Sequence, residues 1–231
     1  MRERARSTED KAQRSEDLLA AAEALALELG GVRFVTVAAV TERAGLHRTG
    51  VRRYYASKEE LLLALAERGW THWRNAISTR LAGRTRLGPS DVSDMLVETI
   101  ASLPVFCDLL AHATMSLEGD VDIECARRYK THAFAAHDEI IELLELASLM
   151  SNSQLRALVA ATLPLASGLW QAAHPTPTLA ELYQQVPGWR HLTLDFTAHL
   201  TVLLRAMAVG LVETLPAPDA VVRDPVGPTE P

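Results

Sequence analysis

The sequence predicts an all-α protein with two parts, an N-terminal three-helix module and a larger C-terminal helical domain. Leu and Ala dominate, only 5% of the residues are aromatic, and the β-branched runs typical of strands are scarce. Apolar residues recur at three- and four-residue spacing in segments separated by Gly, Pro and capping-box patterns. With 231 residues, 48% of them hydrophobic, the chain can bury a sizeable core.

The first predicted helix spans residues 15–29 and ends at Gly30 and Gly31. Its apolar side is formed by Leu18, Ala22, Leu25, Ala26 and Leu29. Residues 1–14 precede it as a flexible arm with five basic side chains. This arm is either a DNA-contacting segment or a solvated tail.

Two short helices are predicted at residues 36–44 and 47–55, with Gly45 between them. This is the pattern of a helix-turn-helix, in which two short helices cross steeply and a Gly permits the left-handed backbone of the turn. The residues expected to be buried are Val40, Ala44, Leu46, Val51 and one of Tyr54 and Tyr55. The helix-turn-helix domain therefore covers residues 15–56.

A long helix follows, opened by a capping box of Ser57 with Glu60 and continuing past Trp73. Capping-box spacing also occurs at Ser151 with Gln154 and at Thr178 with Glu181. Further helices are predicted at residues 91–102, 104–115, 122–147, 154–173, 179–185 and 191–215. Together they form a second domain, residues 57–215, and five prolines within residues 216–231 predict a disordered tail.

The apolar segment 191–213 is about long enough to span a bilayer, but Asp195 and Arg205 lie within it. We therefore expect a packed protein helix and no membrane span. The charged N-terminus has no apolar signal-peptide core, which predicts a cytoplasmic protein. In a reducing cytosol, Cys107 and Cys125 are expected to be free thiols.

The formal net charge of −6 is unevenly distributed. Residues 33–58 carry six basic side chains and one acidic side chain, a local charge of +5, whereas residues 61–231 carry twelve basic and nineteen acidic, a charge of −7. Lys and Arg supply much of the affinity of proteins for phosphate. The helix-turn-helix is therefore the part of the chain suited to nucleic acid.

Residues 30–65, GGVRFVTVAAVTERAGLHRTGVRRYYASKEELLLAL, resemble the DNA-binding region of the TetR (tetracycline-repressor) family, and the resemblance covers residues 15–65. It combines a first helix ending in Gly31, Thr36 opening the second helix, the AGL turn, and an aromatic residue followed closely by Ser-Lys-Glu-Glu-Leu. It implies a transcriptional regulator that binds a double-stranded, palindromic DNA operator as a homodimer. The regulator would be a repressor released by a small-molecule effector.

The resemblance places the DNA contacts at residues 47–55, whose N-terminal end would enter the major groove. Arg can bind guanine bidentately and a Thr methyl can meet a thymine methyl, so the candidates for base contacts are His47, Arg48, Thr49 and Arg52. The candidates for phosphate contacts are Thr36, Tyr54 and Lys58. Arg53 faces either phosphate or solvent.

Three residues depart from the family pattern. Arg52 stands where Tyr is most common, which alters the preferred bases. Gly50 replaces a residue that usually offers a hydroxyl to phosphate, and Gly costs a helix about 1 kcal/mol relative to Ala. Thr41 occupies a position usually held by Ala, where the two helices of the motif come closest.

The resemblance also implies that the C-terminal domain forms the homodimer and encloses a ligand pocket. Residues 191–213 carry two apolar stripes, which favours one packing partner inside the subunit and one across the dimer. We expect the dimer to form through residues 154–173 and 191–215. The candidates for pocket lining, each of which could also be ordinary core, are Trp70, Trp73, Phe106, Cys107, His112, Met115, Tyr129, Phe134, His137 and Trp170.

Two rival functions stay open. A helical enzyme or metal-binding protein would draw on Cys125, His132, His137 and Asp138, but His132 and His137 are five positions apart rather than three or four. We therefore predict no catalytic residues, no metal site and no cofactor. A DNA-binding regulator that senses no ligand would be built on the same dimer.

Overall fold

The computed structural model is all-α and describes residues 2–47, 50–186, 188–189 and 194–215. Within these ranges no strand is present, and one isolated bridge joins Leu87 to Ser148. The helices are α1 (Arg2–Leu29), α2 (Val37–Arg43), α3 (Lys58–Leu81), α4 (Pro89–Ala101), α5 (Pro104–Met115), α6 (Ile123–Ala147), α7 (Asn152–Ala173), α8 (Pro177–Gln185) and α9 (Phe196–Thr214). Short 3-10 turns lie at η1 (Val32–Phe34), η2 (Val51–Arg53) and η3 (Leu117–Gly119).

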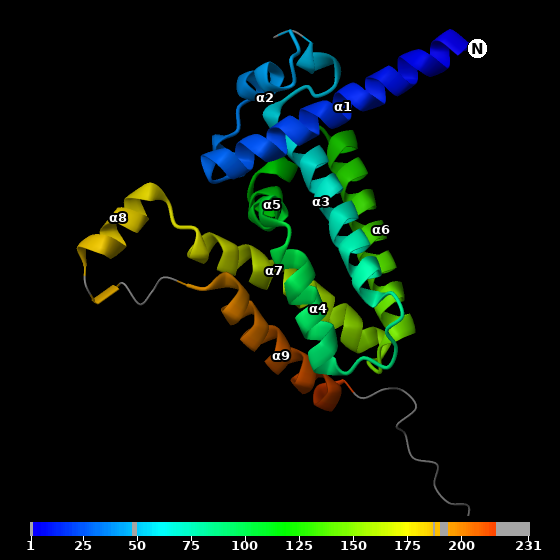
Figure 1. Ribbon diagram of the computed structural model, residues 1–231, viewed down its shortest axis with the longest axis vertical. Helices are drawn as coiled ribbons and strands as arrows, with labels where there is room; N and C mark the ends of the chain where they lie inside the picture. The colour runs from blue at the N-terminus through cyan, green and yellow to red at the C-terminus, as the bar shows by residue number, and fades with distance from the viewer. Residues whose placement is uncertain (1, 48–49, 187, 190–193, 216–231) are drawn as a thin grey trace, which may run out of the picture.

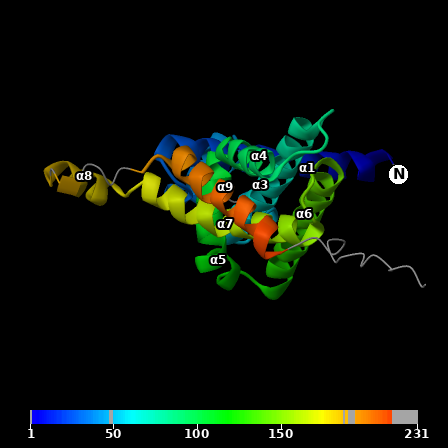
Figure 2. The same ribbon diagram turned by 90° about the horizontal axis from the view of Figure 1, so that it is seen from below.

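Helices α1 and α2 form one end of the molecule, and α3 runs from this end into the body (Figure 1). Helices α3 and α6 lie side by side along the body, while α4, α7 and α9 pack together at the opposite end. Seen from below, α8 projects away from the other helices (Figure 2). The predicted division into a small N-terminal module and a larger helical domain therefore matches the observed architecture.

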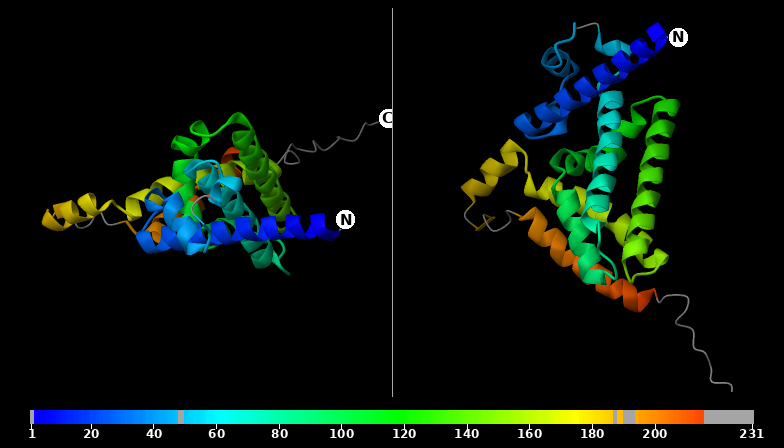
Figure 3. Two further views of the ribbon diagram at one scale, coloured as in Figure 1. Left: turned by 90° about the horizontal axis from the view of Figure 1, so that it is seen from above. Right: turned by 45° about the vertical axis from the view of Figure 1, so that its right-hand side comes forward.

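The N-terminal half of α1 extends beyond the body (Figure 3). The helix begins at Arg2, whereas the sequence analysis placed its start at residue 15. Among residues 10–29, whose side chains the structure describes, the first buried residue is Leu18, so apolar periodicity gave no sign of the turns just before it. Residues 2–14 contain no Gly or Pro, and nine of these thirteen residues are Arg, Glu, Ala or Lys, all of which favour helix.

Side-chain caps define most of the helix starts. Ser57 Oγ accepts a hydrogen bond from Glu60 N at 3.1 Å, and the capping box of Ser151 with Gln154 is complete, as predicted. The prediction for α8 was wrong, because its N-cap is Thr176 rather than Thr178. A proline at the first helical position, as in α4 and α8, loses no hydrogen bond and has a suitable φ, so these helices begin earlier than expected.

Helix α9 begins at Phe196, one residue after its N-cap Asp195, and not at residue 191 as predicted; residues 191–193 lie outside the described part of the chain. By length and composition alone it is the single helix of the described residues long and apolar enough to cross a membrane. Its buried residues are Phe196, Leu200, Leu204 and Ala208. Arg205 forms a two-pronged ion pair with Asp94 of α4, both N···O distances being 2.6 Å. Helix α9 thus packs on the helical domain through one face, against α4 and α7.

An aromatic cluster fixes α3 against α5. The ring centroids of Trp70 and Trp73 are 5.8 Å apart, and Phe106 lies 5.5 Å from Trp70 and 6.3 Å from Trp73. The helices can approach this closely because Gly69 has no side chain, since a Cβ there would lie 2.3 Å from Phe106 Cδ2. Trp73 Nε1 also donates a hydrogen bond to Thr99 Oγ1 of α4.

Candidate DNA-binding site and ligand cavity

The turn of the predicted helix-turn-helix forms as expected. Gly45 has a φ of 64°, in the left-handed region. The amide of Leu46 donates to the Thr41 carbonyl and that of Gly45 to the Glu42 carbonyl, each at 3.0 Å, so α2 ends in the paired hydrogen bonds of a Schellman motif. Among the predicted anchors, Val40, Val51 and Tyr55 are buried, while Ala44, Leu46 and Tyr54 are partly buried.

The second helix of the motif is shorter than predicted. In place of an α-helix over residues 47–55, the described residues contain the 3-10 turn η2, and Gly50 N donates a hydrogen bond to the His47 carbonyl. Gly50 has αR backbone angles but costs helix stability, which favours this tighter, shorter winding. Arg48 and Thr49, two of the predicted base contacts, lie outside the described residues.

Four other predicted DNA contacts lie at the cap of α2 and in the segment of η2. Thr36 caps α2 by accepting a hydrogen bond from Ala39 N at 3.2 Å, which leaves its hydroxyl proton available to a phosphate. His47, Arg52 and Arg53 are exposed. Within the described ranges, the side chains of Arg52 and Arg53 form no ion pair or hydrogen bond. The structure therefore leaves these four residues exposed, with Thr36 at the cap of α2 and the other three in or before η2.

Two basic residues of the +5 segment are engaged within the protein. Arg43 pairs with Glu28 of α1 through its two terminal nitrogens, Nη1 and Nη2, at 2.7 and 2.5 Å. Lys58, predicted to contact phosphate, donates a hydrogen bond from Nζ to the Arg33 carbonyl at 2.8 Å. Lys58 therefore holds η1 against the start of α3, and its ammonium keeps two further protons for any phosphate contact.

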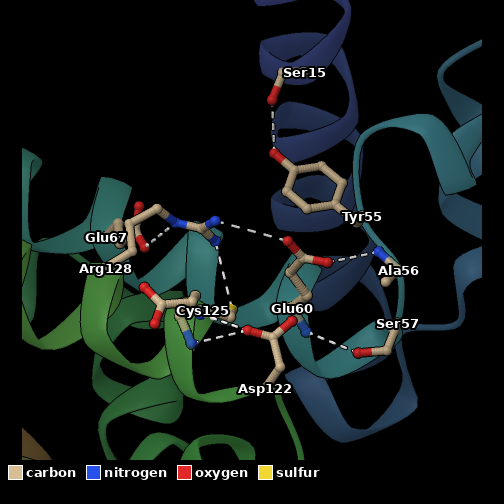
Figure 4. A network of polar contacts seen from close by, with 10 residues as sticks. Ser15, Tyr55, Ala56, Ser57, Glu60, Glu67, Asp122, Cys125 and Arg128 are labelled. Atoms are coloured by element: carbon tan, nitrogen blue, oxygen red, sulfur yellow. Dashed lines mark hydrogen bonds and ion pairs between the residues drawn. The ribbon is translucent and has the colours of Figure 1, made fainter.

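A network of polar contacts joins the end of the helix-turn-helix to the helical domain (Figure 4). Tyr55 shares a hydrogen bond of 2.7 Å with Ser15 of α1, and burial raises the pKa of its hydroxyl. Next to it, Glu60 accepts a hydrogen bond from Ala56 N. Arg128 of α6 reaches Glu60 at 3.7 Å, so a single guanidinium connects α6 to the entry of α3.

Arg68 joins α3 to α1 in a similar way. Its side chain is 11% exposed, and its guanidinium pairs with Glu16 at 2.6 Å and with Glu23 at 2.7 Å. It also donates to the Leu19 carbonyl at 2.9 Å. Charge-assisted hydrogen bonds to a shielded group are among the stronger polar contacts, so α1 and α3 are held as one unit.

A cavity of about 650 Å³ lies in the helical domain between α3, α5, α6 and α7, and we call it the ligand cavity. Its walls are mostly apolar, with a few polar groups. Glu118 and Lys130 form an ion pair of 2.8 Å at its edge. The lining comprises Trp70, Leu110, Ala111, Thr114, Met115, Glu118, Tyr129, Lys130, Ala133, Phe134, His137, Ala160, Leu163, Pro164, Ser167 and Gly168.

Half of the pocket candidates from the sequence line this cavity. They are Trp70, Met115, Tyr129, Phe134 and His137, of which Met115 and Phe134 are 86% and 65% exposed and so lie at its mouth. The remaining candidates lie elsewhere. Trp73, Phe106 and Cys107 are buried core residues, His112 lines a small cavity beside Lys58, and Trp170 lines another between α1, α5 and α7.

One polar group in the wall of the ligand cavity is unsatisfied. Trp70 is 5% exposed, and within the described part of the chain its Nε1 has no acceptor in hydrogen-bond geometry. Burial raises the pKa of Tyr129, and the nearby Trp70 indole partly opposes that rise. Because the Trp70 N–H lies near Tyr129 without a proper hydrogen bond, it is available to an acceptor that enters the cavity.

The cysteines and histidines do not assemble into a reactive centre within the described ranges. No group of three or more His, Cys, Asp or Glu side chains there could hold a metal ion. Both thiols are buried, and burial raises the pKa of Cys107 to about 12. A thiol with so high a pKa is protonated and weakly nucleophilic at neutral pH.

Comparison with known proteins decides the family. Residues 18–65 match the family model described as "Bacterial regulatory proteins, tetR family". Residues 67–214 match the model described as "Tetracyclin repressor-like, C-terminal domain". The chain belongs to the TetR family. It is therefore a DNA-binding transcriptional regulator, of a family whose members are typically non-enzymatic.

A solved structure shares the TetR fold of this chain. It is the crystal structure of a possible TetR family transcriptional regulator from Streptomyces coelicolor A3(2), with a TM-score of 0.55 and 20% sequence identity. The similarity covers 88% of this chain and 99% of the other. No curated protein sequence matches the chain.

The three departures from the TetR pattern have visible effects. Thr41 is 2% exposed, and its hydroxyl donates to the Val37 carbonyl of its own helix at 2.6 Å, so this buried hydroxyl is satisfied. Gly50 accompanies the short winding of the second helix. Arg52 is exposed beside the turn, where a longer charged group replaces the usual aromatic ring.

Sequence reasoning missed Arg68, Asp108 and Arg128, the residues that join the two parts of this TetR protein. Asp108 is the clearest of them, because it is 8% exposed on α5 and accepts two hydrogen bonds. A signal was present in the sequence, since Asp108 is the one acidic residue in the apolar run 103–115. A carboxylate there requires partners, because a buried charge is costly without them.

Proposed function

We propose that this TetR protein is a cytoplasmic, ligand-responsive repressor. Its homodimer would bind a palindromic operator, and a small molecule in the ligand cavity would release it. The observation that carries this proposal is the cavity of about 650 Å³, whose wall contains α3, the helix that begins directly after the helix-turn-helix. An occupant of that cavity would contact the element that positions the DNA-binding end.

The surface around η2 supports sequence-specific DNA binding. Arg52 is exposed and free of ion pairs within the described residues, so its guanidinium is available to a guanine edge. Because the protein is acidic overall, specific contacts of this kind matter more than bulk charge. Selection of bound sequences from random DNA with the purified protein should yield one symmetric sequence. Recovery of no preferred sequence would refute operator binding.

The outer face of α9 supports dimer formation together with α7. Val202 and Val209 are 68% and 50% exposed and belong to the face opposite the buried one. An apolar face of this length is expected to be covered by a partner, and an isologous contact would cover it in both subunits. Sedimentation at micromolar concentration should show a dimer, and a monomer would contradict this part of the proposal.

The ligand we expect is an apolar or amphipathic molecule with a hydrogen-bond acceptor. The apolar wall would bind its hydrocarbon part, while the unsatisfied Trp70 N–H would bind the acceptor. Such a ligand would favour a subunit arrangement whose two DNA-binding surfaces no longer fit successive major grooves.

Thermal unfolding across a metabolite library tests ligand sensing, because a compound that binds only the folded state raises Tm. The variant Ala133→Leu reduces the space in the cavity and should remove the response. Ala135→Leu is a matched control, since Ala135 is exposed on the same helix and does not line the cavity. A library without any stabilising compound would instead indicate a regulator that senses no ligand.

A further inference from the structure

A single carboxylate joins the DNA-binding module to two helices of the ligand domain. Asp108 Oδ2 accepts a hydrogen bond from Val32 N at 2.7 Å, and Oδ1 accepts one from Gln171 Nε2 at 2.7 Å. Val32 opens η1, which directly precedes the helix-turn-helix, whereas Gln171 lies on α7. Asp108 itself lies on α5, so three elements meet at one side chain.

The helices that hold this bridge also form walls of the ligand cavity. Ala111 follows Asp108 by three positions on α5 and lines the cavity, as does Ser167, which precedes Gln171 by four positions on α7. Residues three or four apart share one side of a helix. A change in the separation of α5 and α7 around an occupant would therefore change the distance between Asp108 and Gln171, which lie within about one helical turn of the cavity wall.

The bridge holds η1 on the helical domain together with the hydrogen bond from Lys58 Nζ to the Arg33 carbonyl. The Val32 amide is buried and has no turn of its own helix to satisfy it, so Asp108 supplies the missing acceptor. Beside the bridge lies a cavity of about 230 Å³ between α1, α5 and α7. Because this cavity interrupts the packing between α1, α5 and α7, the hydrogen bonds of Asp108 help to hold these elements together.

We propose that Asp108 is the positioning residue that transmits occupancy of the ligand cavity to the helix-turn-helix. An occupant that moves α7 away from α5 breaks the hydrogen bond from Gln171 to the Asp108 carboxylate. The carboxylate, held then by α5 alone, no longer fixes the position of Val32. Segment η1 and the Thr36 cap that follows it shift with Val32. This inference rests on the proposed function, since it assigns a route to the ligand response.

A covalent occupant makes the test independent of the natural ligand. Ser167→Cys introduces a thiol into the cavity wall, and N-benzylmaleimide attached to it occupies the cavity. The native cysteines are buried, which protects them from the reagent. The quantity measured is the ratio of operator affinity before and after labelling, with the operator obtained by selection. Ala135→Cys carries the same label outside the cavity and should leave the affinity unchanged.

In the parent Ser167→Cys protein, labelling should weaken operator binding by about tenfold, within the usual range of allosteric coupling. Adding Asp108→Ala should bring the ratio close to one. Asp108→Asn should keep the parent ratio, because its Oδ1 can accept from Val32 N while its amide donates to Gln171 after that amide turns over. A purely structural role would lower both affinities equally and leave the ratio unchanged.

Gln171→Leu removes the hydrogen bond between α7 and Asp108. Because Gln171 is exposed, this variant should fold and can test the inference even if Asp108→Ala fails to fold. It too should bring the ratio toward one. The inference is overturned if labelling does not change operator affinity, or if the ratio survives Asp108→Ala or Gln171→Leu. Failure of the proposed function is a different result, namely the absence of a selected operator or of any stabilising compound.

Discussion

The contact between Gly69 and Phe106 allows a prediction in which a substitution changes sign with its background. In Gly69→Ala, the new methyl would lie 2.3 Å from Phe106 Cδ2 and 2.8 Å from Cγ. Carbon atoms in contact are normally about 3.5–4.0 Å apart. The methyl must therefore displace the ring or separate α3 from α5.

Two opposing effects set the magnitude. Replacing Gly by Ala inside a helix stabilises it by about 1 kcal/mol, whereas overpacking a core costs about 1–3 kcal/mol. Because the predicted contacts are severe and Phe106 is locked between Trp70 and Trp73, we expect the upper part of that range. The net expectation is a loss of about 1–2 kcal/mol in the free energy of unfolding.

In a Phe106→Ala background the ring is absent, and the nearest remaining contact is the Cβ of residue 106 at 3.1 Å. There Gly69→Ala should be neutral or stabilising by up to about 1 kcal/mol, so the two substitutions couple by about 2 kcal/mol. Phe106→Ala alone should cost about 3–5 kcal/mol, and Phe106→Leu is the milder alternative.

Urea denaturation at one fixed protein concentration measures these differences as shifts of the midpoint at constant m. Gly168→Ala is the matched control, because a Cβ at Gly168 meets nothing within 4 Å and should gain the helix preference alone. The reasoning fails if Gly69→Ala is as stable as the parent, or if its effect is the same with and without the Phe106 ring.

Three further predictions concern DNA binding, pairing and thiol chemistry. Arg52→Ala should relax the selected sequence, whereas Lys58→Ala should weaken all sites alike and reduce the salt slope by about one, as binding titrations at several salt concentrations would show. Val209→Glu should convert the dimer to a monomer in sedimentation, while Leu146→Glu, at an 85% exposed residue of α6, should not. At about pH 8 the Cys107 thiol should resist maleimide until the protein unfolds, because burial raises its pKa to about 12; rapid labelling seen by mass spectrometry would contradict this.

Local rules in the sequence were sufficient for the elements whose partners are close along the chain. The turn at Gly45 and the cap at Ser57 depend on neighbours within about one helical turn, and both form as predicted. The second helix of the motif is the exception. Gly50 marks a position of low helix propensity in the sequence, but propensity alone does not say where a short helix will end.

Contacts between distant segments were not predictable in the same way. Val32 and Asp108 are 76 positions apart, and Arg68 and Leu19 are 49 apart, so no spacing rule relates them. The pocket candidates show the same limit. Trp70 lines the cavity while Trp73, one turn later, is fully buried, because the outcome depends on which neighbour covers each side of α3.

Helix α3 has 24 residues, and at about 1.5 Å per residue it is about 36 Å long. Gly69, where α3 touches Phe106 most closely, is the twelfth of those residues. Because this contact lies at the midpoint of α3, next to Trp70, the helix can tilt about it with segments of nearly equal length on either side. A tilt that shifts the Leu81 end in one direction therefore carries the Lys58 end a similar distance in the other.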